Sequence, residues 1–152
     1  MARKSAKVYR VSCQVRENYQ VEIEAREHLV IADEPKPYGD NEGMTPVELL
    51  LGALGACKTM VFKAYATQKN IPYKECLIEV EGDFDSAGYM GDPTVPIGFS
   101  EIRTRYHLTS SADKALIDAA IAHVESHCPV AATIDVAPKK EIIVNVVNLC
   151  KV

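Results

Sequence analysis

The residues of this sequence best suited to chemistry are its five cysteines, two of which occupy distinctive positions. Cys57 closes an apolar run over residues 49–57, and Cys128 directly precedes Pro129. A cysteine in a reducing compartment is either a small packing residue or, as the thiolate, a nucleophile. Because proline suits the first position of a helix, Pro129 predicts a short helix to Ile134. Cys128 would then lie at a helix N-terminus, where the helix dipole lowers a thiol pKa.

The remaining cysteines, Cys13, Cys76 and Cys150, give weaker signals. An odd count cannot pair completely within one chain, and the wide spacings contain no Cys-x-x-Cys. The sequence therefore predicts neither a disulfide framework nor a zinc ribbon. Cys13 and Cys76 fall on apolar faces of predicted strands, so we expect both in the core. We assign no role to Cys150, which lies close to the chain end.

A metal site is an alternative interpretation of Cys128. His123 and His127 share one face of a predicted helix, and Cys128 follows directly. Imidazole and thiolate are common zinc ligands, but structural zinc takes four ligands and the sequence shows no clear fourth. A solvated helix face with one histidine beside Cys128 explains the same residues. We therefore expect no bound metal.

Three short strands are predicted at the start of the chain. Apolar and polar residues alternate over 7–15, which is typical of a half-buried strand. A short polar turn leads into a second alternating run over 19–25, and the two runs predict a β-hairpin. Residues 28–32 form a third strand, and the prolines and glycines over 35–43 indicate a loop.

Three neighbouring residues predict the start of a long helix. Thr45 can be the N-cap, Pro46 fits the first helical position, and Glu48 completes a capping box. The helix continues to about Gln68. Its first half is apolar on all sides, which indicates that it is buried on most sides.

The second half of the sequence predicts three more strands and a second main helix. A loop over 86–98 contains three glycines and two prolines. A second helix, capped by Ser110 or Ser111, runs to about His127. The last strand is apolar on both faces, which predicts that it is covered on both sides. The three strands expected in this part of the chain cover residues 75–84, 99–109 and 141–148.

The predicted order is β-β-β-α-β-β-α-β, an α+β fold with mostly antiparallel sheet and two main helices. The length of 152 residues fits a single domain over 1–152. The first helix is more apolar than one sheet in a monomer requires, which favours dimerisation through helices and sheet.

Composition excludes several classes of protein. The chain has 17 Lys and Arg against 21 Asp and Glu, and a net charge of -4, which argues against nucleic-acid or anionic-membrane binding. An apolar fraction of 47% is that of a globular protein. No stretch approaches the roughly 20 apolar residues of a membrane span, and no apolar core follows the basic N-terminus. We therefore expect a cytoplasmic protein.

Two motifs of this sequence resemble the OsmC/Ohr superfamily. The first is Gly-x-x-Pro-x-Glu-Leu-Leu-Leu…Cys over Gly43–Cys57, and the second is His-Cys-Pro-Val over His127–Val130. The order of predicted elements around them is also similar, so the resemblance covers nearly the whole chain. It implies the OsmC-like fold in a tightly intertwined homodimer, with two sites at the subunit interface.

The resemblance also implies a thiol peroxidase that reduces organic hydroperoxides without a cofactor. In that family, the cysteine matching Cys57 is the peroxidatic thiolate, and the one matching Cys128 resolves it. The thiolate attacks the O–O bond and becomes a sulfenic acid. The second thiol condenses with this sulfenic acid to a disulfide, which an external dithiol reductant reopens.

An arginine that stabilises the thiolate, and a carboxylate that holds the arginine, complete the family's site. Arg16 matches the arginine position of the Ohr branch, and we choose it. The alternative is Arg26, which shares a polar strand face with Glu22 and Glu24.

Glu48 is the candidate carboxylate, and here the sequence departs from the family pattern. Ohr and OsmC members carry their Glu immediately after the Pro, where this chain has Val47. One residue along a helix is a rotation of about 100°, so Glu48 either orients the arginine or serves only as a helix cap. Its placement is more similar to a third, less characterised branch.

Two functions from different classes therefore follow. The first is a thiol peroxidase with Cys57, Cys128, Arg16 and Glu48 as site residues. The second is a non-catalytic OsmC-like protein that binds a small molecule or senses oxidation reversibly, and the displaced Glu48 favours it.

Overall fold

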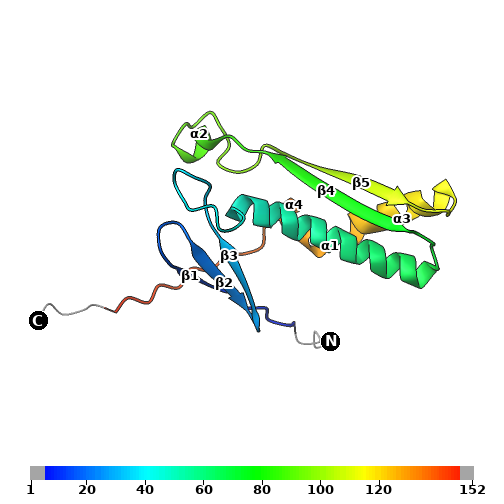
Figure 1. The fold of residues 1–152 in the computed structure, drawn as a ribbon, viewed down its shortest axis with the longest axis horizontal. Coiled ribbons are helices and arrows are strands. Elements are labelled where there is room, and N and C mark those ends of the chain that lie inside the picture. Colours follow the sequence, from blue (N-terminus) through cyan, green and yellow to red (C-terminus); the bar gives the residue numbers. More distant parts are fainter. Residues whose placement is uncertain (1–5, 148–152) are drawn as a thin grey trace, which may run out of the picture.

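The computed structural model describes residues 6–147, and it begins with a three-stranded antiparallel sheet (Figure 1). The sheet order is β1-β2-β3, with Cys13 opposite Ile23 and Ile23 opposite Val30. The predicted hairpin and third strand are confirmed. The strands are β1 (Ser12–Val15), β2 (Val21–Ala25) and β3 (His28–Ala32).

The first sheet packs against little else in the described chain, so the predicted burial of β1 is wrong. Val15 is exposed, and Cys13, which we expected in the core, is exposed as well. The contacts of these strands are almost all with one another. An alternating pattern predicts that one face will be covered, but it does not identify the covering element.

The loop from β3 to the first helix is built around the buried carboxylate of Asp33. It accepts hydrogen bonds from the backbone N–H groups of Glu34 at 2.8 Å, Asp40 at 3.1 Å and Glu42 at 3.0 Å. These bonds, the one from Glu42 foremost, hold the pKa of Asp33 below its ordinary value. Gly39 is required here, because a Cβ would meet the Glu34 carbonyl oxygen at 2.2 Å.

The long helix α1 (Pro46–Lys69) begins as predicted. The backbone N–H of Glu48 donates to the Thr45 hydroxyl at 3.3 Å, and the Thr45 N–H donates to the Glu48 carboxylate at 2.8 Å. These two bonds form the expected capping box. At the other end, Asn70 adopts a left-handed conformation with φ of 52° and closes the helix.

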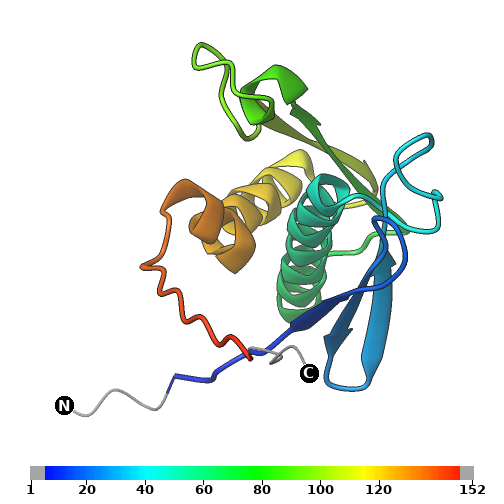
Figure 2. The same cartoon turned by 90° about the vertical axis from the view of Figure 1, so that its left-hand side faces the viewer.

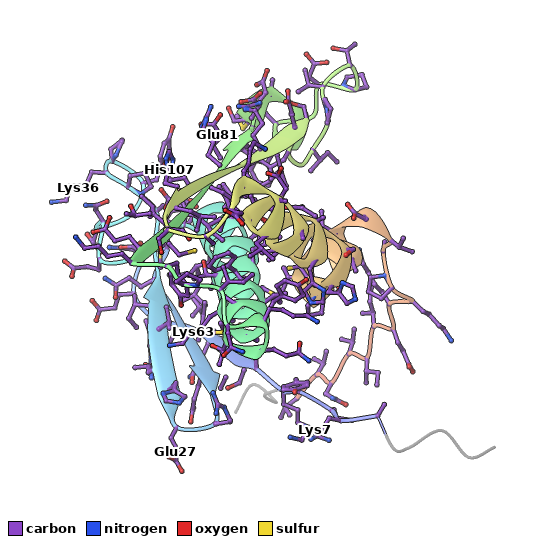
Figure 3. All side chains as sticks on the ribbon, turned by 90° about the vertical axis from the view of Figure 1, so that its right-hand side faces the viewer. Lys7, Glu27, Lys36, Lys63, Glu81 and His107 are labelled. Atoms are coloured by element: carbon purple, nitrogen blue, oxygen red, sulfur yellow. The ribbon has the colours of Figure 1, made fainter. Side chains whose placement is uncertain are left out.

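An antiparallel hairpin of β4 (Glu75–Asp83) and β5 (Glu101–Thr109) lies along α1 (Figure 1). The inner face approaches the helix closely, since a Cβ on Gly55 would lie 3.3 Å from Val80. The outer face carries cross-strand ion pairs, and Figure 3 shows Glu81 and His107 on the side away from α1. The predicted loop over 86–98 contains one short helix, α2 (Ser86–Tyr89).

The second main helix, α3 (Lys114–His127), lies beside α1 (Figure 2). Its N-cap is Asp113, not Ser110 or Ser111. The Ser110 hydroxyl instead accepts from the N–H of Ala112 and donates to the Pro72 carbonyl, so it fastens the loop before the helix. The apolar core joins the two helices and consists of Phe62, Ala66, Ile71, Ala120 and Val124.

After α3 comes the short helix α4 (Pro129–Asp135), which confirms the helix predicted from Pro129. Residues 137–147 are extended but form no strand in the described part of the chain, so the predicted strand over 141–148 is not observed there. Ile142 and Val147 are 87% and 86% exposed. A strand needs a partner backbone, and the described chain gives this segment none. None of the described helices is long and apolar enough to cross a membrane.

Candidate active site

Cys57 and Cys128 lie next to each other in the structure, although 71 positions separate them in the sequence. Cys57 is half-buried in the middle of α1. Cys128 is 1% exposed and lies at the corner where α3 ends and α4 begins. The two thiols are close enough for Cys128 to be among the groups that shift the Cys57 pKa. The arrangement provides two thiols that can form a disulfide when they are oxidised.

The corner itself explains the position of Cys128. Its backbone N–H donates to the Val124 carbonyl and ends α3. Its sulfur accepts from the N–H of Ala131 at 3.4 Å and serves as the N-cap of α4. The first residues of a helix have no partner for their backbone N–H groups, so Pro129, which has no N–H, is well suited to begin α4.

Several groups act in opposite directions on the Cys57 thiol. Burial raises its pKa, the backbone N–H of Val130 lowers it, and the neighbouring Cys128 raises it. The net effect is a pKa above the ordinary value. No cation of the described chain is among the groups that shift this pKa. In a single chain, Cys57 is therefore a thiol at neutral pH.

Neither candidate arginine acts on Cys57 within one chain. Arg16 lies in the turn after β1, where its Nη2 and Nε contact the Glu22 carboxylate at 2.6 and 3.0 Å. Arg26 lies in the tight turn between β2 and β3 with φ of 58°, next to Glu27 at the free tip of that hairpin (Figure 3).

Glu48 faces Thr45, as its capping role requires. The Thr45 N–H, and next its hydroxyl, lower the Glu48 pKa, so the carboxylate is charged at neutral pH. Glu48 also lines a groove of about 370 Å³ between α1 and β4. The walls of the groove are mostly small or apolar, and they comprise Leu51, Gly52, Gly55, Ala56, Thr59, Ile78 and Val80.

The two histidines proposed as metal ligands stack on each other. The ring centroids of His123 and His127 are 3.9 Å apart, and His123 also stacks on Tyr65 at 4.2 Å. Within residues 6–147, no group of three or more His, Cys, Asp and Glu side chains could hold a metal ion. Cys150 lies outside the described residues, and Cys76 is half-buried against the core as predicted.

A buried lysine that was not among the predicted site residues follows Cys57 directly on α1. Lys58 is 5% exposed, and its Nζ contacts Glu125 of α3 at 2.8 Å. One signal was available in the sequence, because Lys58 falls on the same helical stripe as Leu54 and Phe62. A charged residue on such a stripe indicates a buried partner.

Comparisons with known proteins agree with this fold. A family model described as OsmC-like protein matches residues 39–142. No curated protein matches the sequence significantly. An OsmC-like protein from Mycoplasma pneumoniae is 22% identical, with a TM-score of 0.76 over 88% of this chain and 91% of that chain.

Two further solved structures have similar folds at lower identity. An organic hydroperoxide resistance protein OsmC from Legionella pneumophila is 17% identical, with a TM-score of 0.63 over 86% of this chain and 91% of that chain. An OsmC-like hydroperoxide resistance protein from Jannaschia sp. CCS1 is 16% identical, with a TM-score of 0.56 over 90% and 91%. At these identities, the similarity demonstrates a common fold.

Proposed function

The chain belongs to the OsmC-like protein family, and on this premise we propose that it is a thiol-dependent peroxidase that reduces organic hydroperoxides. The observation that carries the proposal is the proximity of Cys57 and Cys128, which lets Cys128 shift the Cys57 pKa. A peroxide-related redox role is also in keeping with the similar folds of hydroperoxide resistance proteins from Legionella pneumophila and Jannaschia.

The proposed cycle begins at Cys57. Its thiolate attacks one oxygen of the hydroperoxide, an S–O bond forms, and the O–O bond breaks. The leaving alkoxide takes up a proton and departs as an alcohol, which leaves a sulfenic acid on Cys57. Cys128 then attacks this sulfur, water leaves, and a disulfide forms. An external dithiol reductant restores both thiols through thiol–disulfide exchange.

The high pKa of Cys57 in a single chain means that the cycle requires a cation from elsewhere. We assign this role to Arg16, placed at Cys57 by assembly of a homodimer. Glu48 is the proposed carboxylate that orients Arg16, although Arg16 pairs with Glu22 in the single chain. An opposite charge at close range lowers a thiol pKa by stabilising the thiolate.

Three exposed apolar surfaces of the described residues support the homodimer. The first is the sheet β1–β3, where Val15 is 68% exposed. The second is one side of α1, where Leu50 and Met60 are 44% and 71% exposed. The third is the extended segment over 142–147. A segment with two apolar faces suits a strand in a shared sheet.

A second candidate is a non-catalytic protein that binds a small molecule or senses oxidation. Two observations favour it: the raised pKa of Cys57 and the engagement of Glu48 by Thr45. A sensor is oxidised once and does not turn over. Steady-state consumption of cumene hydroperoxide with dithiothreitol as reductant therefore separates this candidate from the peroxidase.

The first test is a mass analysis of the reduced protein after one equivalent of cumene hydroperoxide. We expect rapid loss of two hydrogen masses, which peptide mapping assigns to a bridge between Cys57 and Cys128. Slow oxidation spread over all the cysteines would contradict the two-cysteine cycle.

A further inference from the structure

Lys58 is a buried cation with a complete set of partners. Its Nζ donates to the Thr104 hydroxyl at 2.9 Å and to the two carboxylate oxygens of Glu125 at 2.8 and 2.9 Å. An ammonium has three protons, and each has an acceptor here. Lysine is almost never this buried unless it is paired, so removing Glu125 would leave a costly buried charge on Lys58.

Glu125 also receives a second donor. The hydroxyl of Tyr106 on β5 donates to one carboxylate oxygen of Glu125. Glu125 is thereby held between α1 and β5.

This polar contact lies at the cysteine end of the interface between α1 and α3. Lys58 follows Cys57 directly on α1, and Glu125 lies one helical turn before Cys128. The apolar core that joins the same helices lies farther along, around Phe62. Near the two sulfurs, Lys58 and Glu125 therefore form a polar contact between α1 and the end of α3, next to buried Val124.

Alignment matters because disulfide geometry is narrow. A disulfide needs an S–S distance of about 2.05 Å and Cα atoms roughly 4.4–6.8 Å apart. Misplacement of a reacting group by about an ångström can slow a reaction roughly a hundredfold.

We propose that Lys58, Glu125 and Tyr106 form a positioning clamp that holds Cys128 in attacking distance of Cys57, a proposal that rests on the two-cysteine cycle above. The clamp touches neither hydroperoxide nor the reacting oxygen. It acts on one step only: Cys128 attacks the Cys57 sulfenic acid, the S–S bond forms, the S–O bond breaks, and water leaves.

The test measures the two oxidation steps separately in the full chain. Reduced protein is mixed with cumene hydroperoxide, and the Cys57 sulfenic acid is trapped with dimedone at successive times and quantified by mass. In Lys58→Met we expect formation of the sulfenic acid at the wild-type rate, with a lifetime roughly ten- to a hundredfold longer. The matched control is Lys114→Met. It removes the exposed Lys114–Asp118 ion pair on α3, the helix that also carries Glu125.

A second, milder variant keeps the test valid if Lys58→Met does not fold. Tyr106→Phe leaves the Lys58–Glu125 contact intact and removes only the hydroxyl, and we expect an intermediate lifetime of the sulfenic acid. Circular dichroism and the thermal midpoint identify any variant that has unfolded. If both Lys58→Met and Tyr106→Phe close the disulfide as fast as the wild type, the clamp does not position Cys128.

A hydroperoxide-independent arm distinguishes failure of the clamp from failure of the peroxidase. Oxidised glutathione forms a mixed disulfide at Cys57, which Cys128 displaces with release of reduced glutathione. Equilibration in glutathione buffers then measures how readily the bridge closes. If the wild type fails to react with cumene hydroperoxide, a lower equilibrium constant for formation of the Cys57–Cys128 disulfide in Lys58→Met still supports the clamp, and an equal constant overturns it.

Discussion

The backbone N–H of Val130 lies at the Cys57 thiol, whose pKa it lowers. The next residue, Ala131, donates its N–H to the sulfur of Cys128 at 3.4 Å. The first turn of α4 therefore caps one thiol and lowers the pKa of the other. Because a hydrogen bond to the charged form of a group favours that form, the Val130 N–H offsets part of the effect of burial on the Cys57 pKa.

The two cysteines have different predicted roles, which substitutions separate. We expect Cys57→Ser to abolish hydroperoxide turnover, because no sulfur remains to attack the O–O bond. We expect Cys128→Ser to be oxidised once and to accumulate a Cys57 sulfenic acid that dimedone traps. Hydroperoxide consumption and mass analysis measure both results, with exposed Cys13→Ser as the control. Turnover by Cys57→Ser would end the peroxidase hypothesis.

Arg16 is the predicted source of positive charge at Cys57. We expect Arg16→Met to slow oxidation of Cys57 roughly tenfold or more at neutral pH, since a nearby opposite charge shifts a pKa by about 1–3 units. Stopped-flow measurement with cumene hydroperoxide gives this rate. Arg26→Met is the matched control, because Arg26 also lies in a turn of the same sheet. Equal slowing in both variants would remove the distinction between the two arginines.

Glu48 has a cap role that the structure describes and a site role that we propose, and a conservative change separates them. Gln is also found at this position of capping boxes, so Glu48→Gln should leave the thermal midpoint nearly unchanged. If Glu48 orients Arg16, the same variant should lose roughly ten- to a hundredfold in kcat/KM, as is typical of supporting residues.

The matched variant for Glu48 is Thr45→Ala, which removes the cap hydroxyl. It should lower the free energy of unfolding by about 1 kcal/mol, and urea denaturation measures the loss. Full activity in Glu48→Gln would mean that Glu48 serves the helix alone.

The outer face of the β4–β5 hairpin predicts a specific acid titration. Arg105, and next Arg103, lower the pKa of Glu81 to about 2. Since this folded-state pKa is below the unfolded one, the ion pairs contribute stability above the ordinary Glu pKa and lose it as the pH falls toward 2. NMR titration of the Glu81 carboxyl carbon should show this midpoint.

Removal of one partner checks the cause. We expect Arg105→Gln to raise the Glu81 pKa toward its ordinary value. Lys114→Gln, which breaks an exposed ion pair elsewhere on the surface, should leave the Glu81 pKa in place. The same midpoint in the wild type and Arg105→Gln would assign the low pKa to another group.

Local signals allowed much of the fold to be predicted. Thr45, Pro46 and Glu48 define a helix start within four residues, and the observed capping box follows from these neighbours alone. The helix after Cys128 was predictable for the same reason, because Pro129 acts on the residues directly beside it. Hairpins such as β1–β2 also depend on residues that are close in sequence.

Errors arose where an element depends on a distant partner. Cys13 alternates with polar neighbours as a half-buried residue does, yet nothing in the described chain covers its face. The segment over 141–147 is apolar like a central strand, but it has no backbone to pair with in the described chain. Hydrophobic periodicity specifies which face needs cover, and the covering surface belongs to another part of the chain or to another molecule.

The sequence by itself determined the two cysteine motifs, the helix caps and the order of most elements, because each of these depends on residues within a few positions of one another. Only the tertiary structure decided that Cys57 lies against Cys128, that Lys58 reaches Glu125, and that Arg16 pairs with Glu22. Whether distant side chains meet depends on how helices and strands pack, and packing is set jointly by all the buried surfaces.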